Sequence, residues 1–192
     1  MVCTHLRRMP RQRGVRPATK PVHSRMLHAT SLSVVGKLAD IRMRGYRRCE
    51  NLKSFVVYYA RTGNTGKMAK AIAEGAESAG AEVVVKTVNG VGKEDVSSSD
   101  AIIIGSPTHN KRIPYKVTSF LSSLKDLDLQ GKLGVSFGSY GWSGEGVSIL
   151  NKELEKLGIK LVSKGIRVRR EPGEADLRDL KELGRKVAEA AG

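Results

Sequence analysis

The stretch SFVVYYARTGNTGKMAKAIAEG, residues 54–75, decides the fold that this sequence predicts. It opens with an apolar, aromatic and β-branched run, which is typical of a buried strand. From Thr65 onward, apolar residues such as Met68 and Ile72 recur at helical spacing until Gly80 ends the pattern. Thr, Gly and Asn residues join the two segments. Such a junction between strand and helix either cradles a phosphate group or is only a loop.

The same alternation of strand and helix patterns continues along the chain. The connection at residues 88–99 is polar and predicts no element. Strands that alternate with helices, with continuously apolar central strands, indicate a doubly wound α/β domain whose helices cover both faces of a parallel sheet. The predicted strands are residues 53–59, 81–88, 100–106, 132–139 and 159–170, and the predicted helices are residues 65–79, 114–124, 146–158 and 176–191.

Three loops of this domain form the candidate site. Ligands of doubly wound domains bind beyond the carboxyl ends of the strands, so the loops after the first, third and fourth strands are the informative ones. They contain Trp142, the only Trp of the chain, and His109, the only His after residue 50. Because this part of the chain has one His and no Cys, we expect no transition-metal site in it.

The first loop suits a phosphate group. Thr62, Asn64 and Thr65 offer hydroxyl and amide donors, and Arg61 adds a positive charge. Gly63 and Gly66 let backbone N–H groups approach an anion at the start of a helix. The loop matches neither GxxxxGK[ST] nor GxGxxG, which favours a terminal monophosphate over a triphosphate with magnesium. The alternative is that Thr65 only caps the helix and the loop binds nothing.

The second and third loops offer room for a flat ring. Two aromatic side chains on a Gly-rich segment form one wall, and the second loop forms the other. A phosphate cradle beside such a slot fits a mononucleotide with a wide, apolar ring. The candidate residues are Pro107, Thr108, His109 and Asn110 in the second loop, followed by Gly138, Tyr140, Gly141, Trp142 and Gly144 in the third.

The motifs TGNT, GSPTHN and FGSYGWSG, in this order, resemble those of flavodoxins, and most of all the flavodoxin-like module of A-type flavoproteins (flavodiiron proteins). The resemblance covers residues 53–191. It implies a five-stranded sheet of order 2-1-3-4-5 that binds FMN non-covalently, with the phosphate at residues 62–65 and the isoalloxazine between residues 106–110 and 139–142. The resemblance thus adds Ser106 and Ser139 to the predicted cofactor residues, and Lys111 follows them in the second loop. Flavodoxins often have Ser or Thr where Ala60 stands, and Arg61 or Lys67 is the candidate to compensate.

The resemblance also implies the function that we expect. FMN links two-electron donors to one-electron acceptors, so we predict an electron carrier rather than an enzyme with its own substrate. No HxHxD-type ligand run is present, so we expect no reduction of oxygen or nitric oxide at iron by this chain alone. Lys111 and Arg112 predict a less negative flavin potential than that of an acidic flavodoxin. Two alternatives stay open: an FMN-dependent NAD(P)H:quinone or related reductase, and a nucleic-acid or membrane-binding module driven by a basic tail.

The first 50 residues differ in charge from the rest of the chain. They carry twelve Lys and Arg against two acidic residues, whereas residues 51–192 carry 22 against 17. We predict a disordered tail over residues 1–50 and one FMN-binding domain over residues 51–192. Three interpretations of the tail stay open: a segment without a role or one added by a start codon upstream of Met43, an organelle-targeting segment, and a basic arm for nucleic acid or anionic membranes.

The charge of the domain also bears on its partners. Its excess of basic residues favours redox proteins with acidic docking surfaces. We expect no specific nucleic-acid binding, no transmembrane segment, and a monomer or weak dimer. We predict a cytoplasmic protein, with targeting to an organelle by the tail as the alternative.

Overall fold

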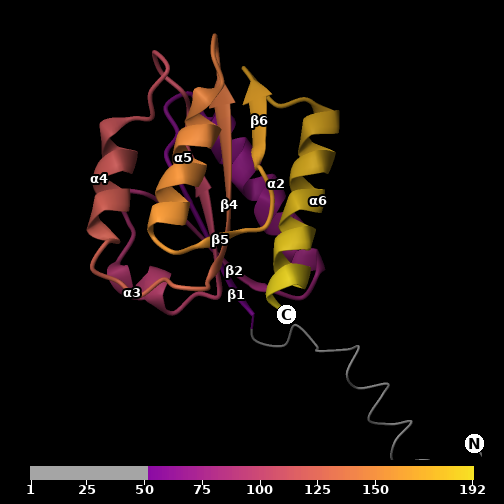
Figure 1. Ribbon diagram of the computed structural model, residues 1–192. Helices are drawn as coiled ribbons and strands as arrows, with labels where there is room; N and C mark the ends of the chain where they lie inside the picture. Colours follow the sequence, from indigo (N-terminus) through magenta and orange to yellow (C-terminus); the bar gives the residue numbers. More distant parts are fainter. Residues whose placement is uncertain (1–51) are drawn as a thin grey trace, which may run out of the picture. The chain divides into compact units, whose positions relative to one another are not determined.

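The computed structural model describes residues 52–192, and the tail predicted over residues 1–50 lies outside them. The sheet has the order β2-β1-β3-β4-β5, and β6 also pairs with β4; all pairs are parallel (Figure 1). This confirms the predicted fold class and strand order. The strands are β1 (Lys53–Tyr58), β2 (Glu82–Thr87), β3 (Ala101–Gly105), β4 (Leu133–Tyr140), β5 (Lys160–Leu161) and β6 (Ile166–Arg169). The helices are α2 (Asn64–Ser78), α3 (Lys93–Ser97), α4 (Tyr115–Ser123), α5 (Glu145–Lys156) and α6 (Glu174–Ala191).

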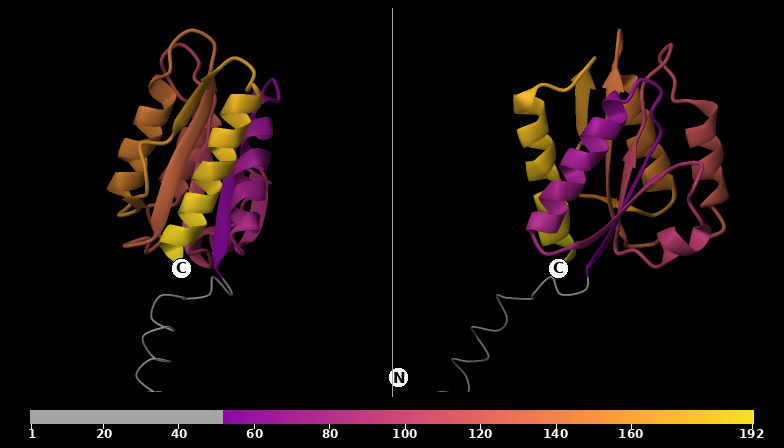
Figure 2. Two further views of the ribbon diagram at one scale, coloured as in Figure 1. Left: turned by 90° about the vertical axis from the view of Figure 1, so that its right-hand side faces the viewer. Right: turned by 180° about the vertical axis from the view of Figure 1, so that it is seen from behind.

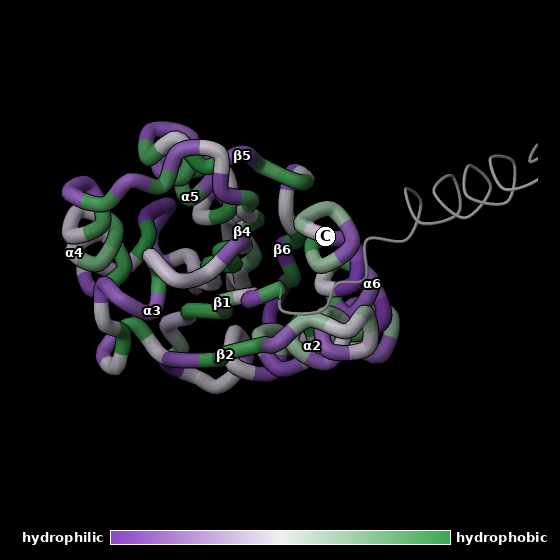
Figure 3. Tube along the Cα trace, turned by 90° about the horizontal axis from the view of Figure 1, so that it is seen from below, coloured by the Kyte–Doolittle hydropathy of each residue, from purple (hydrophilic) through white to green (hydrophobic). Residues whose placement is uncertain are grey.

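Helices cover both faces of the sheet. Successive residues of a strand point to opposite faces, so neighbouring residues of one strand pack against different helices. Phe55 and Val57 of β1 pack with α3, α4 and α5, whereas Val56 packs with α2 and α6. Figure 2 shows the two helix layers on either side of the sheet, and Figure 3 shows hydrophobic strands between them. No helix within residues 52–192 has the length and apolar character that crossing a membrane requires.

The prediction of one continuous strand over residues 159–170 is wrong, because this segment contains two strands, β5 and β6. Residues 162–165 leave the strand conformation, and Gly165 has a φ of 79°. A side chain there would bring Cβ within 2.2 Å of the Ser136 carbonyl oxygen. Asn151 donates a hydrogen bond to the carbonyl oxygen of Lys164 at 3.0 Å and so holds the break in place. After it, β6 resumes pairing beside the carboxyl end of β4.

Helix α3 lies in the connection for which no element was predicted. Its single buried residue, Val96, gives no periodic signal. The helix is fixed at its start by Asp95, whose carboxylate accepts a hydrogen bond from the backbone N–H of Gly92 at 2.9 Å. Lys86 donates to the same carboxylate, and this hydrogen bond lowers the pKa of Asp95. The remaining predicted elements agree with the structure to within two residues at each end.

Two buried serines predict opposite effects on stability. The Ser54 hydroxyl, on β1, is buried without a hydrogen-bond partner. The Ser136 hydroxyl, on β4, is 2.6 Å from Asn151 Oδ1. Since an unsatisfied buried hydroxyl costs free energy and a satisfied one contributes about 1 kcal/mol, we expect Ser54→Ala to hold or raise the free energy of unfolding and Ser136→Ala to lower it by about 1 kcal/mol. Urea denaturation of both variants measures this, and a larger loss at Ser54 would contradict it.

Candidate functional site

The three predicted loops meet at one cavity of about 510 Å³ at the carboxyl edge of the sheet. Eleven of the predicted cofactor residues line it, together with Arg170 from the end of β6. The loops thus meet as the doubly wound topology requires. The lining residues are Arg61, Thr62, Asn64, Pro107, Thr108, His109, Asn110, Ser139, Tyr140, Gly141, Trp142 and Arg170.

The amino end of α2 borders this site, and no acidic side chain in its first turn offsets the positive end of the helix dipole. Gly63 precedes the helix with a φ of 88°, and no side chain caps the helix. The first turn of α2 has no acidic residue, as is also true of α4, whereas the first turns of α3, α5 and α6 each contain Glu or Asp. The N–H groups of a first helical turn have no partners within the helix. This end of α2 is therefore available to an anion.

The side chain of Thr65 holds the first loop against β4. Its buried hydroxyl lies 2.9 Å from the hydroxyl of Ser139, so it points toward the strand end and does not line the cavity. Lys67 pairs with Glu171, and its hydrogen bond and charge lower the pKa of that carboxyl. Of the two candidates to compensate for Ala60, only Arg61 lines the cavity.

The second loop continues beside β4 and then turns back on itself. The backbone N–H of Thr108 donates to the carbonyl oxygen of Ser139 at 2.8 Å. Its hydroxyl accepts a hydrogen bond of 3.2 Å from the N–H of Gly146 at the start of α5. Because both bonds fix Thr108, the loop lies against the third loop at a defined position.

Residues 109–112 form a two-residue hairpin. His109 and Arg112 exchange backbone hydrogen bonds of 2.9 Å and 2.8 Å. The central residues, Asn110 and Lys111, both have positive φ, 47° and 61°. This is the pattern of a type I′ turn, in which Asn is favoured and Lys is uncommon. The hairpin holds His109 and Asn110 at the cavity and leaves Lys111 outside its lining.

The third loop presents the aromatic wall. Tyr140 ends β4 and is half-buried, whereas Trp142 is 92% exposed. Both line the cavity. Beneath them, a Cβ on Gly138 would lie 2.3 Å from the carbonyl oxygen of Ser106, so a larger residue at position 138 would push the second and third loops apart.

The structure places the other predicted residues around the cavity rather than in its lining. Thr65 and Ser106 make buried hydrogen bonds, and Gly138 allows close packing against the backbone of Ser106. The full set outside the lining is Gly63, Thr65, Gly66, Ser106, Lys111, Gly138 and Gly144.

Arg170 is the lining residue that the sequence analysis missed. Its N–H donates to the carbonyl oxygen of Tyr140 at 2.7 Å, and its φ of 63° is unusual for a residue other than Gly. The prediction placed it at the end of one long fifth strand. Only the break between β5 and β6 brings it beside the end of β4.

Charged groups surround Glu145 at the start of α5. A hydrogen bond from Ser143 lowers the pKa of Glu145, and the charges of Lys111 and Arg167 lower it further. One of its carboxylate oxygens is buried without a hydrogen-bond partner. Cations from two different elements, the second loop and β6, therefore act on this one carboxylate.

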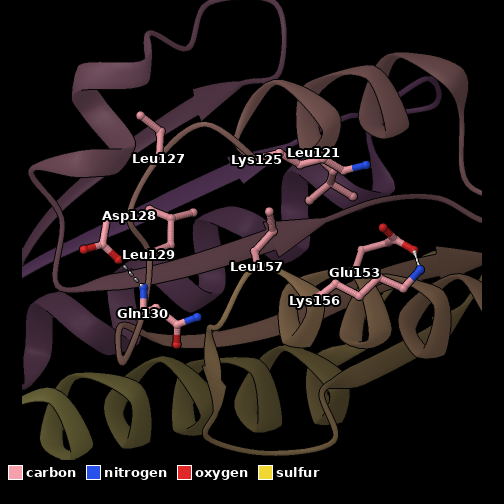
Figure 4. A pocket seen from close by; sticks show the side chains of 9 residues that line it. All are labelled: Leu121, Lys125, Leu127, Asp128, Leu129, Gln130, Glu153, Lys156 and Leu157. Atoms are coloured by element: carbon pink, nitrogen blue, oxygen red, sulfur yellow. Dashed lines mark hydrogen bonds and ion pairs between the residues drawn. The ribbon is translucent and has the colours of Figure 1, made fainter.

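A second cavity of about 370 Å³ lies at the opposite edge of the sheet, between the ends of α4 and α5 (Figure 4). Four leucines line it, and charged side chains such as Lys156 and Glu153, which form an ion pair, stand at its rim. It contains none of the predicted cofactor residues. The four leucines are Leu121, Leu127, Leu129 and Leu157.

The family model for flavodoxin matches residues 56–184. The chain belongs to the flavodoxin family. It is 34% identical over 144 residues to a protein named type A flavoprotein fprA from Rhodobacter capsulatus, covering 71% of this chain and 33% of that protein. It is 32% identical to the rubredoxin-oxygen oxidoreductase of Megalodesulfovibrio gigas, covering 72% of this chain and 35% of that protein.

Solved structures give the same relationship. An archaeal flavodoxin shares 33% identity with a TM-score of 0.71, covering 73% of this chain and 99% of its own. The rubredoxin:oxygen oxidoreductase of Desulfovibrio gigas shares 30% identity with a TM-score of 0.69, covering 81% of this chain and 40% of its own. The chain spans about a third of the curated relatives above, and nearly all of the archaeal flavodoxin. As a member of this flavodoxin family, the chain has FMN as its cofactor.

Proposed function

We propose that this chain is a flavodoxin-type electron carrier that passes electrons between redox proteins. The observation that carries the proposal is one cavity that combines the uncapped, acid-free start of α2 with the aromatic third loop. FMN, when bound, supplies chemistry that accepts and donates electrons singly or in pairs. The protein residues supply binding, orientation and charge.

The described residues fit FMN in two parts. Thr62, Asn64 and the first N–H groups of α2 would bind the phosphate, with Arg61 as an added cation. Pro107 to Asn110 on one side and Tyr140 and Trp142 on the other would enclose the isoalloxazine. The supporting fact is that one cavity of about 510 Å³ contains both parts.

Reconstitution with FMN tests the proposal. Trp142 is the only Trp of the chain and is largely exposed, so its fluorescence is expected to fall as FMN stacks beside it. The loaded protein should be reduced by a partner reductase and should reoxidise with one-electron acceptors. Steady turnover with NAD(P)H and a quinone, in the absence of a second protein, would favour the reductase alternative instead.

The positions of the cations relative to the cavity predict which of them has the larger effect on the flavin potential. Arg170 lines the cavity, whereas Lys111 lies outside the lining and interacts electrostatically with Glu145, whose negative charge offsets part of its effect. At an effective dielectric of about 20, one charge at about 10 Å contributes roughly 1.7 kcal/mol, or roughly 70 mV for one electron. We expect Arg170→Gln to make the flavin potential more negative by several tens of mV and Lys111→Gln by less than half as much.

Equilibrium redox titration of the two variants measures the difference, with Arg112→Gln as a further comparison on the same hairpin. Equal shifts, or a larger one at Lys111, would show that the second loop sets the potential, as the sequence alone suggested.

A further inference from the structure

We infer that four cations beside the site, Lys111, Arg112, Arg167 and Arg169, form a docking surface for an acidic redox protein; we name them the basic rim. This inference rests on the proposed electron-carrier function and locates the surface through which that function would act. All four side chains are exposed, and none belongs to an ion pair within residues 52–192.

Strand β6 brings two of these cations to the third loop. Val168 is buried among residues that pack with α2 and α6, so Arg167 and Arg169 point to the opposite face of the sheet. Arg169 pairs with Tyr140 in the parallel register. The Cδ atom of Arg167 lies 3.0 Å from where a Cβ on Gly144 would stand. Both arginines therefore flank the segment that carries Trp142.

The hairpin of the second loop supplies the other two. The second loop lies against the start of α5, because the N–H of Gly146 donates to the hydroxyl of Thr108 at 3.2 Å and a Cβ on Gly146 would lie 3.6 Å from the Ile113 side chain. Glu145 offsets one charge of the rim. Two further arginines, Arg61 and Arg170, line the cavity itself. The carboxyl edge of the sheet is therefore strongly positive around the predicted flavin.

Exposed aromatic side chains occur in the segments next to the basic rim, Trp142 on the third loop and Tyr115 three residues after Arg112. Trp142 is 92% exposed and Tyr115, at the start of α4, is 83% exposed. They are two of the three large hydrophobic side chains that are exposed within residues 52–192. Arg, Tyr and Trp are the residues most enriched where proteins bind each other tightly. A surface of these residues around a cofactor cavity fits a protein partner with an acidic face.

Protection of a sheet edge and binding to nucleic acid account for the basic rim less completely. Charges on an edge strand such as β6 prevent sheets from pairing edge to edge, but this does not explain the hairpin cations. Binding to nucleic acid would favour a positive stripe that follows a phosphate backbone. Here the cations surround a concave site, and an electron donor or acceptor must approach that site closely.

Binding to a plant-type ferredoxin, a small acidic iron–sulfur protein, tests the inference. The FMN-free and FMN-loaded protein are titrated calorimetrically with ferredoxin at low and high salt. Attraction between opposite charges predicts affinity that falls as salt is raised. We expect Arg167→Glu/Arg169→Glu to weaken ferredoxin binding at least tenfold at low salt. The loss should appear in the FMN-free protein as well, so that it does not depend on how much FMN is bound; neither residue lines the cavity.

A double variant at the other edge of the sheet is the matched control. Lys125→Glu/Lys160→Glu changes the net charge equally, and both residues are exposed there. It should weaken binding less than twofold. The rate at which reduced ferredoxin transfers one electron from its cluster to the flavin of the FMN-loaded protein should fall in Arg167→Glu/Arg169→Glu. The rate should change little in Lys125→Glu/Lys160→Glu.

Equal losses of ferredoxin affinity in the two double variants, or a ferredoxin affinity that does not change with salt, would contradict the proposed docking surface. So would duplex DNA or phosphatidylserine vesicles that bind the basic rim more tightly than ferredoxin does. Failure of the protein to bind FMN would instead overturn the proposed function, and ferredoxin binding to the FMN-free protein separates that result from the first.

Discussion

Asn64→Asp is expected to lower the affinity for FMN by about two orders of magnitude while stabilising the FMN-free protein. Asn64 is the first residue of α2 and lines the cavity. A carboxylate there would meet the positive end of the helix dipole, which the present sequence leaves without an acidic residue. That interaction contributes about 0.3–1 kcal/mol to the FMN-free protein.

The same carboxylate would repel the phosphate dianion. At about 5 Å and an effective dielectric of about 40, suited to an open loop, one charge against a dianion costs roughly 3 kcal/mol. A cost of this size corresponds to a loss of affinity on the order of 10². Asn64→Asp is therefore expected to stabilise the FMN-free protein and to weaken FMN binding at the same time. A general loss of folded protein would not produce both effects.

Riboflavin, which lacks the phosphate, is the control ligand. Its affinity, followed by Trp142 fluorescence, should be nearly unchanged by Asn64→Asp. The variant Asn64→Ala removes the amide without adding a charge, so it should weaken FMN binding by only about tenfold. If Asn64→Asp weakened riboflavin and FMN equally, the phosphate would not bind at the start of α2, and the orientation proposed for FMN would be wrong.

Most of the fold could be predicted because the central strands β1, β3 and β4 are buried on both faces. A strand such as β3 is apolar at each position from Ala101 to Ile104, and such a run has few alternative interpretations. Helix α3 could not be predicted, because it is short and is fixed by hydrogen bonds of Asp95 rather than by an apolar face. The break between β5 and β6 depends on contacts of Gly165 and Asn151 with distant residues.

The candidate site was predictable as far as its loops follow the strands in order. Loop chemistry identified residues such as Thr62 and Trp142, which line the cavity. It could not separate them from supporting residues, since the Thr65 hydroxyl turns to Ser139 only in the folded chain. Arg170 was missed because its position depends on a break in strand pairing that has no local signal.

Gly184→Ala is expected to lower the free energy of unfolding by about 3 kcal/mol, because α2 and α6 touch through their backbones. A Cβ on Gly184 would lie 2.0 Å from the carbonyl oxygen of Ile72. A Cβ on Gly75 would lie 1.9 Å from the carbonyl oxygen of Lys181. The two glycines thus lie at one crossing, each against the backbone of the other helix. Backbone atoms cannot rotate away as a side chain can, so the helices would have to separate.

The sign of the change in unfolding free energy distinguishes a tight crossing of α2 and α6 from a loose one. Within a helix, Ala is intrinsically better than Gly by about 1 kcal/mol, so a loose crossing would make Gly184→Ala stabilising. Gly90→Ala is the control for a Gly→Ala change without a close approach, because Gly90 lies outside the helices and the nearest atom to its Cβ, the Thr87 carbonyl oxygen, is 3.9 Å away. Urea denaturation should show a large loss for Gly184→Ala and little change for Gly90→Ala.

The crossing also connects stability to the site. Helix α2 begins at the cavity and passes Gly184 further along its length, so a displaced α2 moves the N–H groups proposed to bind the phosphate. We expect Gly184→Ala to weaken FMN binding severalfold under conditions where the variant is still folded, although position 184 lies outside the cavity lining. An unchanged free energy of unfolding would show that the helices yield easily at this crossing, and unchanged FMN affinity in a destabilised variant would show that the start of α2 is held by Thr65 and Ser139 alone.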